Sequence, residues 1–320
     1  MNGTSGPCAW FLVGCTASGK TAVANELARR MGALVLSADS MLVYRGMDIG
    51  TAKPTHAELK GIDLRGTDLA DPDEPFSAGR WLETAHATVH EAAAAGRDLI
   101  VAGGTGLYVS ALLNGLDTQA ADRGLRTELE GLLSRGGVSA LVARAESLSP
   151  GSTASVDTQN PRRVMRLVEI LEARAEGPAV DFRAKDAMPN PCAPLVGLDF
   201  PVEELNVRIE RRARAMFEGG LLDEVRTLCR RFPGFKASTA GAGIGYAEAL
   251  AALRGEISVD AAVARTAART RRLAKKQRTW WRHQACVEWV RGPADAADAA
   301  RAAADVLALW RKYGKSPVRA

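Results

Sequence analysis

Cysteines and long apolar runs are both scarce in this sequence. Its 320 residues include five cysteines, widely spaced and without a C-x-x-C pair, which argues against a disulfide framework and against a zinc ribbon. No apolar run reaches the roughly 18 residues that a membrane-spanning helix needs, so we expect no membrane association. A secretory signal has a lysine or arginine before its apolar run, and neither residue precedes the first apolar run here. These absences predict a cytoplasmic protein with free thiols.

Acidic residues are missing from one long segment of the chain. There is none between residues 261 and 287, although the whole chain carries 37 acidic and 42 basic residues. A segment with charges of one sign repels itself unless it meets an anion, so this one predicts a polyanionic partner. Its basic residues are Arg265, Arg269, Arg271, Arg272, Lys275, Lys276, Arg278 and Arg282.

Short apolar runs alternate with helical spacing in much of the chain. Four runs are typical of buried strands: residues 9–14, 33–37, 99–102 and 195–198. Two stretches have helical spacing instead: residues 20–31 and about 78–95. Strands that alternate with helices predict an α/β fold, in which a P-loop NTPase-like parallel sheet is flanked by helices.

Strand patterns disappear between about residues 119 and 190. Helical spacing dominates there, for example at Leu125, Leu129 and Leu132, and a proline-rich stretch marks the end of the region. We therefore predict a helical insertion domain over residues 119–190. Residues 1–118 and 191–320 would then form a P-loop catalytic core with C-terminal helices.

A phosphate-binding motif follows the first predicted strand. The motif G-x-x-x-x-G-K-[ST] is complete here and opens a predicted helix, where backbone N–H groups and the helix dipole attract phosphate oxygens. Lys20 adds a positive charge, and the Thr21 hydroxyl can bind Mg²⁺. Nucleotides such as ATP are frequent ligands of this motif. Its residues are Gly14, Cys15, Thr16, Ala17, Ser18, Gly19, Lys20 and Thr21.

Two further strand ends carry candidate functional residues. Asp39 follows the second predicted strand, where ligands of open α/β sheets bind, and it can act as a general base or cap the next turn. The third strand ends in Gly103–Gly104, followed by the hydroxyl of Thr105. A carboxylate for the Mg²⁺ of an ATPase is missing at that strand end, which weakens the ATPase interpretation.

The run Asp39–Pro54 closely resembles a signature of the tRNA dimethylallyltransferase (IPP transferase) family, and so does the P-loop. Further matches follow in the family's order, so that the resemblance spans about residues 10–290. They are Asp71–Pro72 with Phe76–Ala78, Gly103–Tyr108, Asn160–Arg163 with Arg166 and Glu169, Arg208 with Arg212, Gly220–Val225, and Thr270–Trp280.

The resemblance implies a reaction. The family transfers the dimethylallyl group of dimethylallyl diphosphate to N6 of adenosine 37, in tRNAs that read codons starting with U, and releases diphosphate. By this analogy the P-loop holds the donor's diphosphate rather than ATP, with Mg²⁺ on Thr21 and Lys20 neutralising the leaving group. Asp39 would take the proton from the attacking amine. Thr105 and Arg212 would contact the donor's phosphates or the adenine.

The resemblance also implies contacts with tRNA, in which the insertion domain binds the anticodon arm. We expect the protein to act as a monomer. A base that reacts at its exocyclic amine must leave the stack to enter such a site. The implied contact residues are Asp39, Ser40, Met41, Leu42, Thr105, Arg126, Gln159, Asn160, Pro161, Arg162, Arg163, Gly245, Tyr246, Arg271, Lys275, Lys276 and Arg278.

The sequence departs from the family pattern in two places, and two other functions stay open. Histidines expected near residues 63–67 are absent, and the loop 241–247 lacks a basic residue after its tyrosine. One alternative is an isopentenyltransferase that acts on free AMP, ADP or ATP, which would need neither the insertion nor the basic segment. The other is a small-molecule kinase with ATP in the P-loop.

Overall fold

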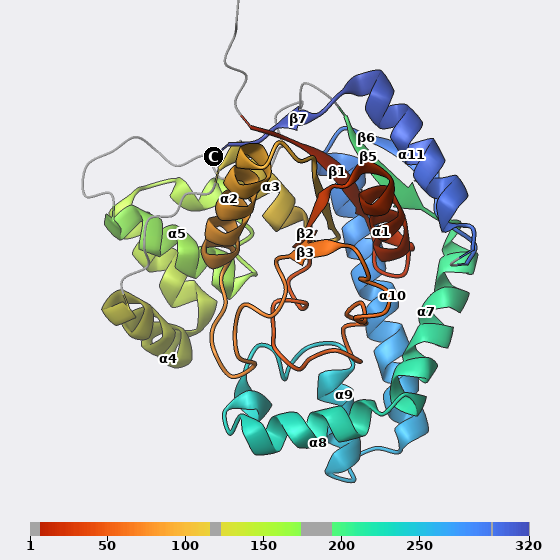
Figure 1. Ribbon diagram of the computed structural model, residues 1–320. Helices are drawn as coiled ribbons and strands as arrows, with labels where there is room; N and C mark the ends of the chain where they lie inside the picture. The colour runs from red at the N-terminus through yellow and green to blue at the C-terminus, as the bar shows by residue number, and fades with distance from the viewer. Residues whose placement is uncertain (1–6, 116–122, 174–193, 296, 320) are drawn as a thin grey trace, which may run out of the picture. The chain divides into compact units, whose positions relative to one another are not determined.

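The computed structural model describes residues 7–115, 123–173, 194–295 and 297–319 (Figure 1). The chain falls into two compact units, one of residues 1–116 and 189–320 and the other of residues 117–188. Among the described residues, no helix is both long enough and apolar enough to cross a membrane.

The larger unit is built on a sheet whose strands lie in the order β3-β2-β4-β1-β5-β6, with every neighbouring pair parallel. A short strand, β7, pairs antiparallel with the start of β1. All five residues of β2 are buried, as expected for a strand covered on both faces. The strands are β1 (Cys8–Gly14), β2 (Leu34–Ala38), β3 (Asp63–Arg65), β4 (Leu99–Gly103), β5 (Leu195–Asp199), β6 (Val287–Arg291) and β7 (Ser316–Pro317).

Helices cover both faces of this sheet (Figure 1). On one face lie α1 (Lys20–Met31) and α11 (Ala299–Tyr313), and Trp310 stacks on Trp10 of β1 at 5.2 Å between ring centroids. On the other face lie α2 (Ala78–Ala94) and α3 (Gly106–Asn114), joined by stacking of Trp81 on Tyr108 at 4.5 Å. The Trp81 indole N–H donates to the Ser37 carbonyl at 2.8 Å, which ties α2 to β2.

Further helices follow β5 in the same unit. The long helix α10 packs along α7, on α9 and against the sheet, and its Trp281 is fully buried. In Figure 1, α7 and α10 run side by side, and α8 runs crosswise to them at the bottom of the view, next to α9. Their bounds are α7 (Val202–Glu218), α8 (Leu221–Arg231), η2 (Phe235–Ala237), α9 (Tyr246–Leu253) and α10 (Val259–Gln284).

The smaller unit has a hydrophobic core of its own. The described part of this unit consists of α4 (Arg123–Leu148), η1 (Ser152–Ser155) and α5 (Pro161–Ala173). The backbone of α4 breaks its helical course at Gly137, whose φ is +64°. The buried residues that hold these helices together are Leu129, Leu141, Ala145, Val164, Met165, Leu167 and Val168.

The α/β fold with a parallel sheet and flanking helices is confirmed, and each of the four strands expected from the sequence is present. The helices expected at residues 20–31 and 78–95 are α1 and α2. Three strands were not predicted. β3 and β7 have only three and two residues, too few for a pattern, and in β6 the alternation of Val287, Glu288 and Trp289 is broken by Val290.

Candidate functional site

The P-loop connects β1 to α1. Gly19, the residue before the helix, has a φ of +86°, a conformation that suits glycine. The first-turn N–H groups of α1 lack acceptors within the helix, which makes this terminus suited to an anion. Lys20 Nζ donates to the Cys15 carbonyl at 2.5 Å, and burial lowers the pKa of this lysine. Burial raises the pKa of the Cys15 thiol, so that it stays neutral.

Three strand ends meet beside the P-loop. β4 lies between β1 and β2, and the register pairs Gly103 with both Val13 and Ala38. The segments after these strands are therefore neighbours at the carboxyl edge of the sheet, where open α/β sheets bind ligands. They carry the P-loop, Asp39 and Thr105, three parts of the site that the sequence predicts.

Asp39 and Thr105 are fixed by backbone hydrogen bonds. The Met41 N–H donates to Asp39 Oδ1 at 2.8 Å, and the Ser40 N–H donates to Thr105 Oγ1 at 3.1 Å. The Thr105 N–H in turn donates to the Ala38 carbonyl at 3.1 Å. In the described residues no donor reaches Asp39 Oδ2, and the Thr105 hydroxyl proton has no acceptor. One basic oxygen and one O–H donor thus remain for a substrate.

Two cavities open on this edge of the sheet. The first has a volume of 560 Å³ and contains the P-loop, Asn25, Pro54, Glu58 and arginines of α7. The second has a volume of 420 Å³ and is lined by Thr105, Gly243, Tyr246, Arg269 and residues of α10. Five residues line both cavities and so form a shared wall, along which the two cavities adjoin: Thr16, Lys20, Asp39, Thr51 and Arg212.

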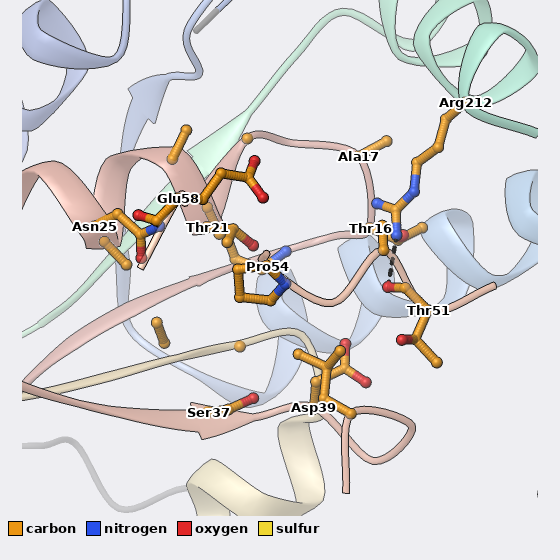
Figure 2. A pocket seen from close by; sticks show the side chains of 18 of the residues that line it. Thr16, Ala17, Thr21, Asn25, Ser37, Asp39, Thr51, Pro54, Glu58 and Arg212 are labelled. Carbon is orange, nitrogen blue, oxygen red and sulfur yellow. Dashed lines mark hydrogen bonds between the residues drawn. The ribbon is translucent and has the colours of Figure 1, made fainter. Parts of the chain in front are cut away.

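Arg212 enters this wall from α7. Figure 2 shows its side chain extending toward Thr51, and its Nη2 donates to the Thr51 carbonyl at 3.0 Å. Burial lowers the pKa of Arg212, an effect that the nearby Asp39 carboxylate opposes. Lys20 is subject to the same attraction from Asp39 and to repulsion from Arg212. Two cations and one carboxylate therefore share a half-buried space, which favours a further anion there.

A second arginine of α7 closes the outer side of the P-loop. Arg208 donates to the carbonyls of Ala17 at 3.0 Å, Pro293 at 3.1 Å and Ala294 at 2.7 Å. Its guanidinium lies over the Phe200 ring, 4.5 Å from the centroid. Because its guanidinium is held by these contacts within the protein, Arg208 forms a fixed part of the lining of the first cavity.

Gln277 is a site residue that sequence reasoning missed. Its Oε1 accepts from the Thr16 N–H at 2.8 Å, and its Nε2 donates to the Gly104 carbonyl at 3.0 Å. A Cβ on residue 104 would lie 2.6 Å from that amide, so any other residue there would displace the Gln277 side chain. The signal in the sequence was one neutral amide within a basic run. Gln277 links α10 to the P-loop and to the loop of Thr105.

Thr21 is the residue that would hold a metal ion. It lines the first cavity, and among the described residues its hydroxyl donates to no protein acceptor. No group of three or more metal-ligating side chains occurs in the described part of the chain. This sparse donor set fits Mg²⁺, which usually binds through one or two protein oxygens together with phosphate oxygens and waters.

The residues of α10 expected to contact tRNA differ in exposure. Arg272, Lys275 and Lys276 are exposed, and Arg271 is half-buried. Arg278 has only 15% of its side chain exposed, because it forms an ion pair with Asp199 at 3.1 Å. Trp281 is fully buried in the core, whereas the half-buried Trp280 lies against Gly106.

The other residues with an implied tRNA contact lie in three places. Met41 and the exposed Ser40 line the second cavity, and Leu42 lines the first. Gly245 and Tyr246 are buried, and the Tyr246 ring forms part of the back wall of the second cavity.

The remaining residues of this set belong to the smaller unit. Arg126 is paired with the buried Glu169 at 2.6 Å and with Glu130 at 3.2 Å. Asn160 Oδ1 accepts from the Arg162 N–H at 3.2 Å at the start of α5. The side chains that stay exposed there are Gln159, Arg162 and Arg163, with Pro161 half-buried as the first residue of the helix.

Comparison with known proteins gives consistent matches. Residues 42–284 match the family model described as IPP transferase. A tRNA dimethylallyltransferase of Anaeromyxobacter dehalogenans (strain 2CP-C) is 43% identical over 289 residues, which cover 89% of this chain and 95% of the relative. One of Corynebacterium efficiens is 39% identical over 284 residues, covering 89% and 94%.

Solved structures share the fold over most of the chain. The full-length tRNA isopentenylpyrophosphate transferase of Bacillus halodurans is 32% identical with a TM-score of 0.68, covering 96% of this chain and 98% of that one. A eukaryotic dimethylallyltransferase acting on tRNA has a TM-score of 0.73 at 22% identity, covering 88% and 74%, which shows the common fold.

Proposed function

This chain belongs to the IPP transferase family, and we propose that it transfers a dimethylallyl group from dimethylallyl diphosphate to N6 of adenosine 37 in tRNAs that read codons starting with U, with release of diphosphate. One observation supports this assignment most strongly. Lys20 of the P-loop and the Asp39 carboxylate lie in a single wall between two cavities. The two cavities adjoin at these side chains, so an anion bound in one and an amine bound in the other can meet there and react.

The first cavity is suited to the donor. Its P-loop N–H groups, Lys20 and Arg212 would bind the diphosphate, and positive charge fixed in place stabilises a leaving group as its charge develops. The second cavity would take the adenine, turned out of the anticodon loop. Two molecules held in adjoining cavities, with their reacting atoms in contact, react as though they were at very high concentration.

The chemical step is a displacement at the first carbon of the prenyl group. The N6 lone pair forms the new N–C bond as the C–O bond to diphosphate breaks, and the electron pair leaves with the diphosphate. The amine then carries one proton too many, and Asp39 Oδ2, which has no donor from the described residues, accepts it. The Thr105 hydroxyl is placed to donate to the reacting groups.

Mg²⁺ would add positive charge beside the leaving diphosphate. Thr21 is the residue of this chain that would hold it, with phosphate oxygens and waters as the other ligands.

The tRNA would be held by sites in both units, and we propose that the reaction takes place in the cytoplasm with a single copy of the chain. The exposed cations of α10 suit the phosphate backbone, which any tRNA presents. The exposed side chains at the start of α5 would contact the anticodon arm. An enzyme for free AMP, ADP or ATP has no need of these surfaces, and neither has a small-molecule kinase.

The first prediction concerns Asp39→Asn. Purified protein with Mg²⁺ and labelled dimethylallyl diphosphate should label tRNA that carries adenosine at position 37. It should leave tRNA with guanosine at that position unlabelled. The substitution should lower turnover by about 10²–10⁴-fold, since an amide cannot accept the proton. Diphosphate should still bind, and no more weakly than to the original protein, because the P-loop is untouched and the charge removed beside it is negative.

Asp260→Asn is the matched control, because this exposed aspartate in the first turn of α10 lines neither cavity, and the same change there should keep turnover near the original value. Label found only on free AMP would favour the alternative enzyme. Unchanged turnover in Asp39→Asn would remove Asp39 as the base.

A further inference from the structure

Glu224 is a half-buried carboxylate on α8 that lines neither of the two reaction cavities. We propose that it is a positioning residue, which holds the backbone of residues 48–50 so that Thr51 keeps Arg212 directed at the diphosphate. The inference deepens the proposed function and rests on it.

Four donors converge on this one carboxylate. Glu224 Oε2 accepts from the N–H of Asp48 at 3.1 Å and of Ile49 at 2.7 Å. Oε1 accepts from the N–H of Gly50 at 3.3 Å and from the Tyr246 hydroxyl at 2.7 Å. Three successive backbone N–H groups on one charged side chain fix a loop that has no strand or helix of its own.

Tyr246, the first residue of α9, provides the fourth donor to the Glu224 carboxylate. Its ring is fully buried, and burial, with the nearby Glu224, raises the pKa of its hydroxyl, so that it stays a donor. A Cβ on residue 50 would lie 2.5 Å from that ring, so the loop approaches Tyr246 as closely as only glycine allows. The loop is therefore held by α8 on one side and by α9 on the other.

The held loop leads directly into the reaction site. Thr51 follows Gly50, and its side chain is anchored by donation from Oγ1 to the Met47 carbonyl at 2.6 Å. Its carbonyl accepts the hydrogen bond from Arg212 at 3.0 Å, the one hydrogen bond of that guanidinium among the described residues (Figure 2). A shift of the Thr51 carbonyl thus moves the guanidinium within both cavities.

The charge and the second oxygen of Glu224 matter to this arrangement. A carboxylate accepts at both oxygens, whereas a glutamine replaces one acceptor with an N–H₂ donor. In Glu224→Gln, the amide nitrogen would take the place of one acceptor oxygen. It would then point at a group that now donates to Glu224, either an N–H of the loop or the Tyr246 hydroxyl. Removing one partner of a half-buried hydrogen bond to a charged group leaves the others poorly matched, and the loop loses its fixed position.

The test is a set of single and double variants. Glu224→Gln should raise the KM for dimethylallyl diphosphate about tenfold and leave the KM for tRNA within about twofold. Tyr246→Phe, which removes one donor and keeps the three backbone donors, should have a smaller effect of about two- to threefold. Asp223→Asn is the matched control, because this neighbour on α8 is 79% exposed and pairs only with Arg226 within the described residues, and it should change nothing.

Non-additivity separates a positioning role from a general loss of stability. If Glu224 acts through Arg212, Glu224→Gln should cost less than about twofold once Arg212 is already alanine. An equal loss in both backgrounds, or an unchanged KM in the single variant, would overturn the inference. Calorimetric binding of inorganic diphosphate to the same variants gives the answer even if the original protein transfers no label to tRNA, a result that would count against the proposed function alone.

Discussion

Single residues set the charge balance at the wall between the two cavities. Lys20 and Arg212 face the same Asp39 carboxylate, and burial lowers the pKa of both cations. A diphosphate brings the negative charge that this space lacks. The binding of the donor should therefore depend on whether Lys20 is charged, and that dependence has a definite sign.

The affinity for dimethylallyl diphosphate should fall as the pH rises through the lowered pKa of Lys20. A bound diphosphate favours the charged ammonium and raises that pKa, so binding takes up a proton in the alkaline range. Titration calorimetry between about pH 7 and pH 10, in buffers that differ in ionisation enthalpy, measures both the affinity and the proton uptake.

The matched variant is Lys20→Arg, which stays charged throughout this range. Dividing the affinity of the original protein by that of Lys20→Arg cancels the pH dependence that comes from protonation of the ligand itself. A ratio that does not vary with pH would show that Lys20 keeps its charge in the free protein.

At the residue scale, the sequence predicts groups that belong to a motif or follow a predicted strand. Lys20, Asp39 and Thr105 are of this kind, because a strand end fixes where the next side chain lies. Gln277 and Glu224 lie within the family matches Thr270–Trp280 and Gly220–Val225, but those matches do not indicate what either side chain contacts. Each has backbone groups as partners, 261 residues away for Thr16 and 174 to 176 residues away for the loop 48–50. A single sequence contains no pattern that indicates contacts between residues so far apart.

At the scale of elements, α10 serves two purposes on different sides. Ala274 and Trp281 pack into the core, and Gln277 reaches the P-loop. Lys275 and Lys276 point away from these contacts and are exposed. Periodicity in the sequence indicates such a helix, but the ion pair of Arg278 with Asp199 could not be predicted, because Asp199 comes from the end of β5.

The double variant Lys275→Ala with Lys276→Ala should weaken tRNA binding and flatten its salt dependence, by a slope of about one for each lost phosphate contact. The KM for dimethylallyl diphosphate should stay the same. Filter binding at several salt concentrations measures the slope.

Arg311→Ala with Lys312→Ala provides a control with the same change in net charge, on two exposed residues in the last turn of α11. Equal losses in the two double variants would indicate an effect of total charge rather than a surface on α10.

At the scale of the whole molecule, the chain divides into two units that each bury their own core. Helical spacing alone suggests where the smaller unit lies, since its helices are amphipathic. Its internal ion pairs, such as Arg126 with Glu169, depend on how α4 and α5 pack and do not follow from spacing. Its role on the anticodon arm stays a prediction.

Leu129→Ala should test this division. Leu129 is 1% exposed in the core of the smaller unit, and its truncation should lower the stability of that unit by about 2–5 kcal/mol. Transfer to tRNA should fall, while calorimetric binding of diphosphate should persist, because the P-loop belongs to the larger unit. Hydrogen exchange localises the loss of protection.

Leu27→Ala, in the core beneath the P-loop helix, is the contrasting variant and should weaken both activities. Loss of diphosphate binding in Leu129→Ala would mean that the two units unfold together.

The wall shared by the two cavities also bears on inhibitor design. A compound that joins a diphosphate mimic to an adenine through a short linker would occupy both hollows at once. Each half would raise the effective concentration of the other, so that two weak ligands combine into a tight one.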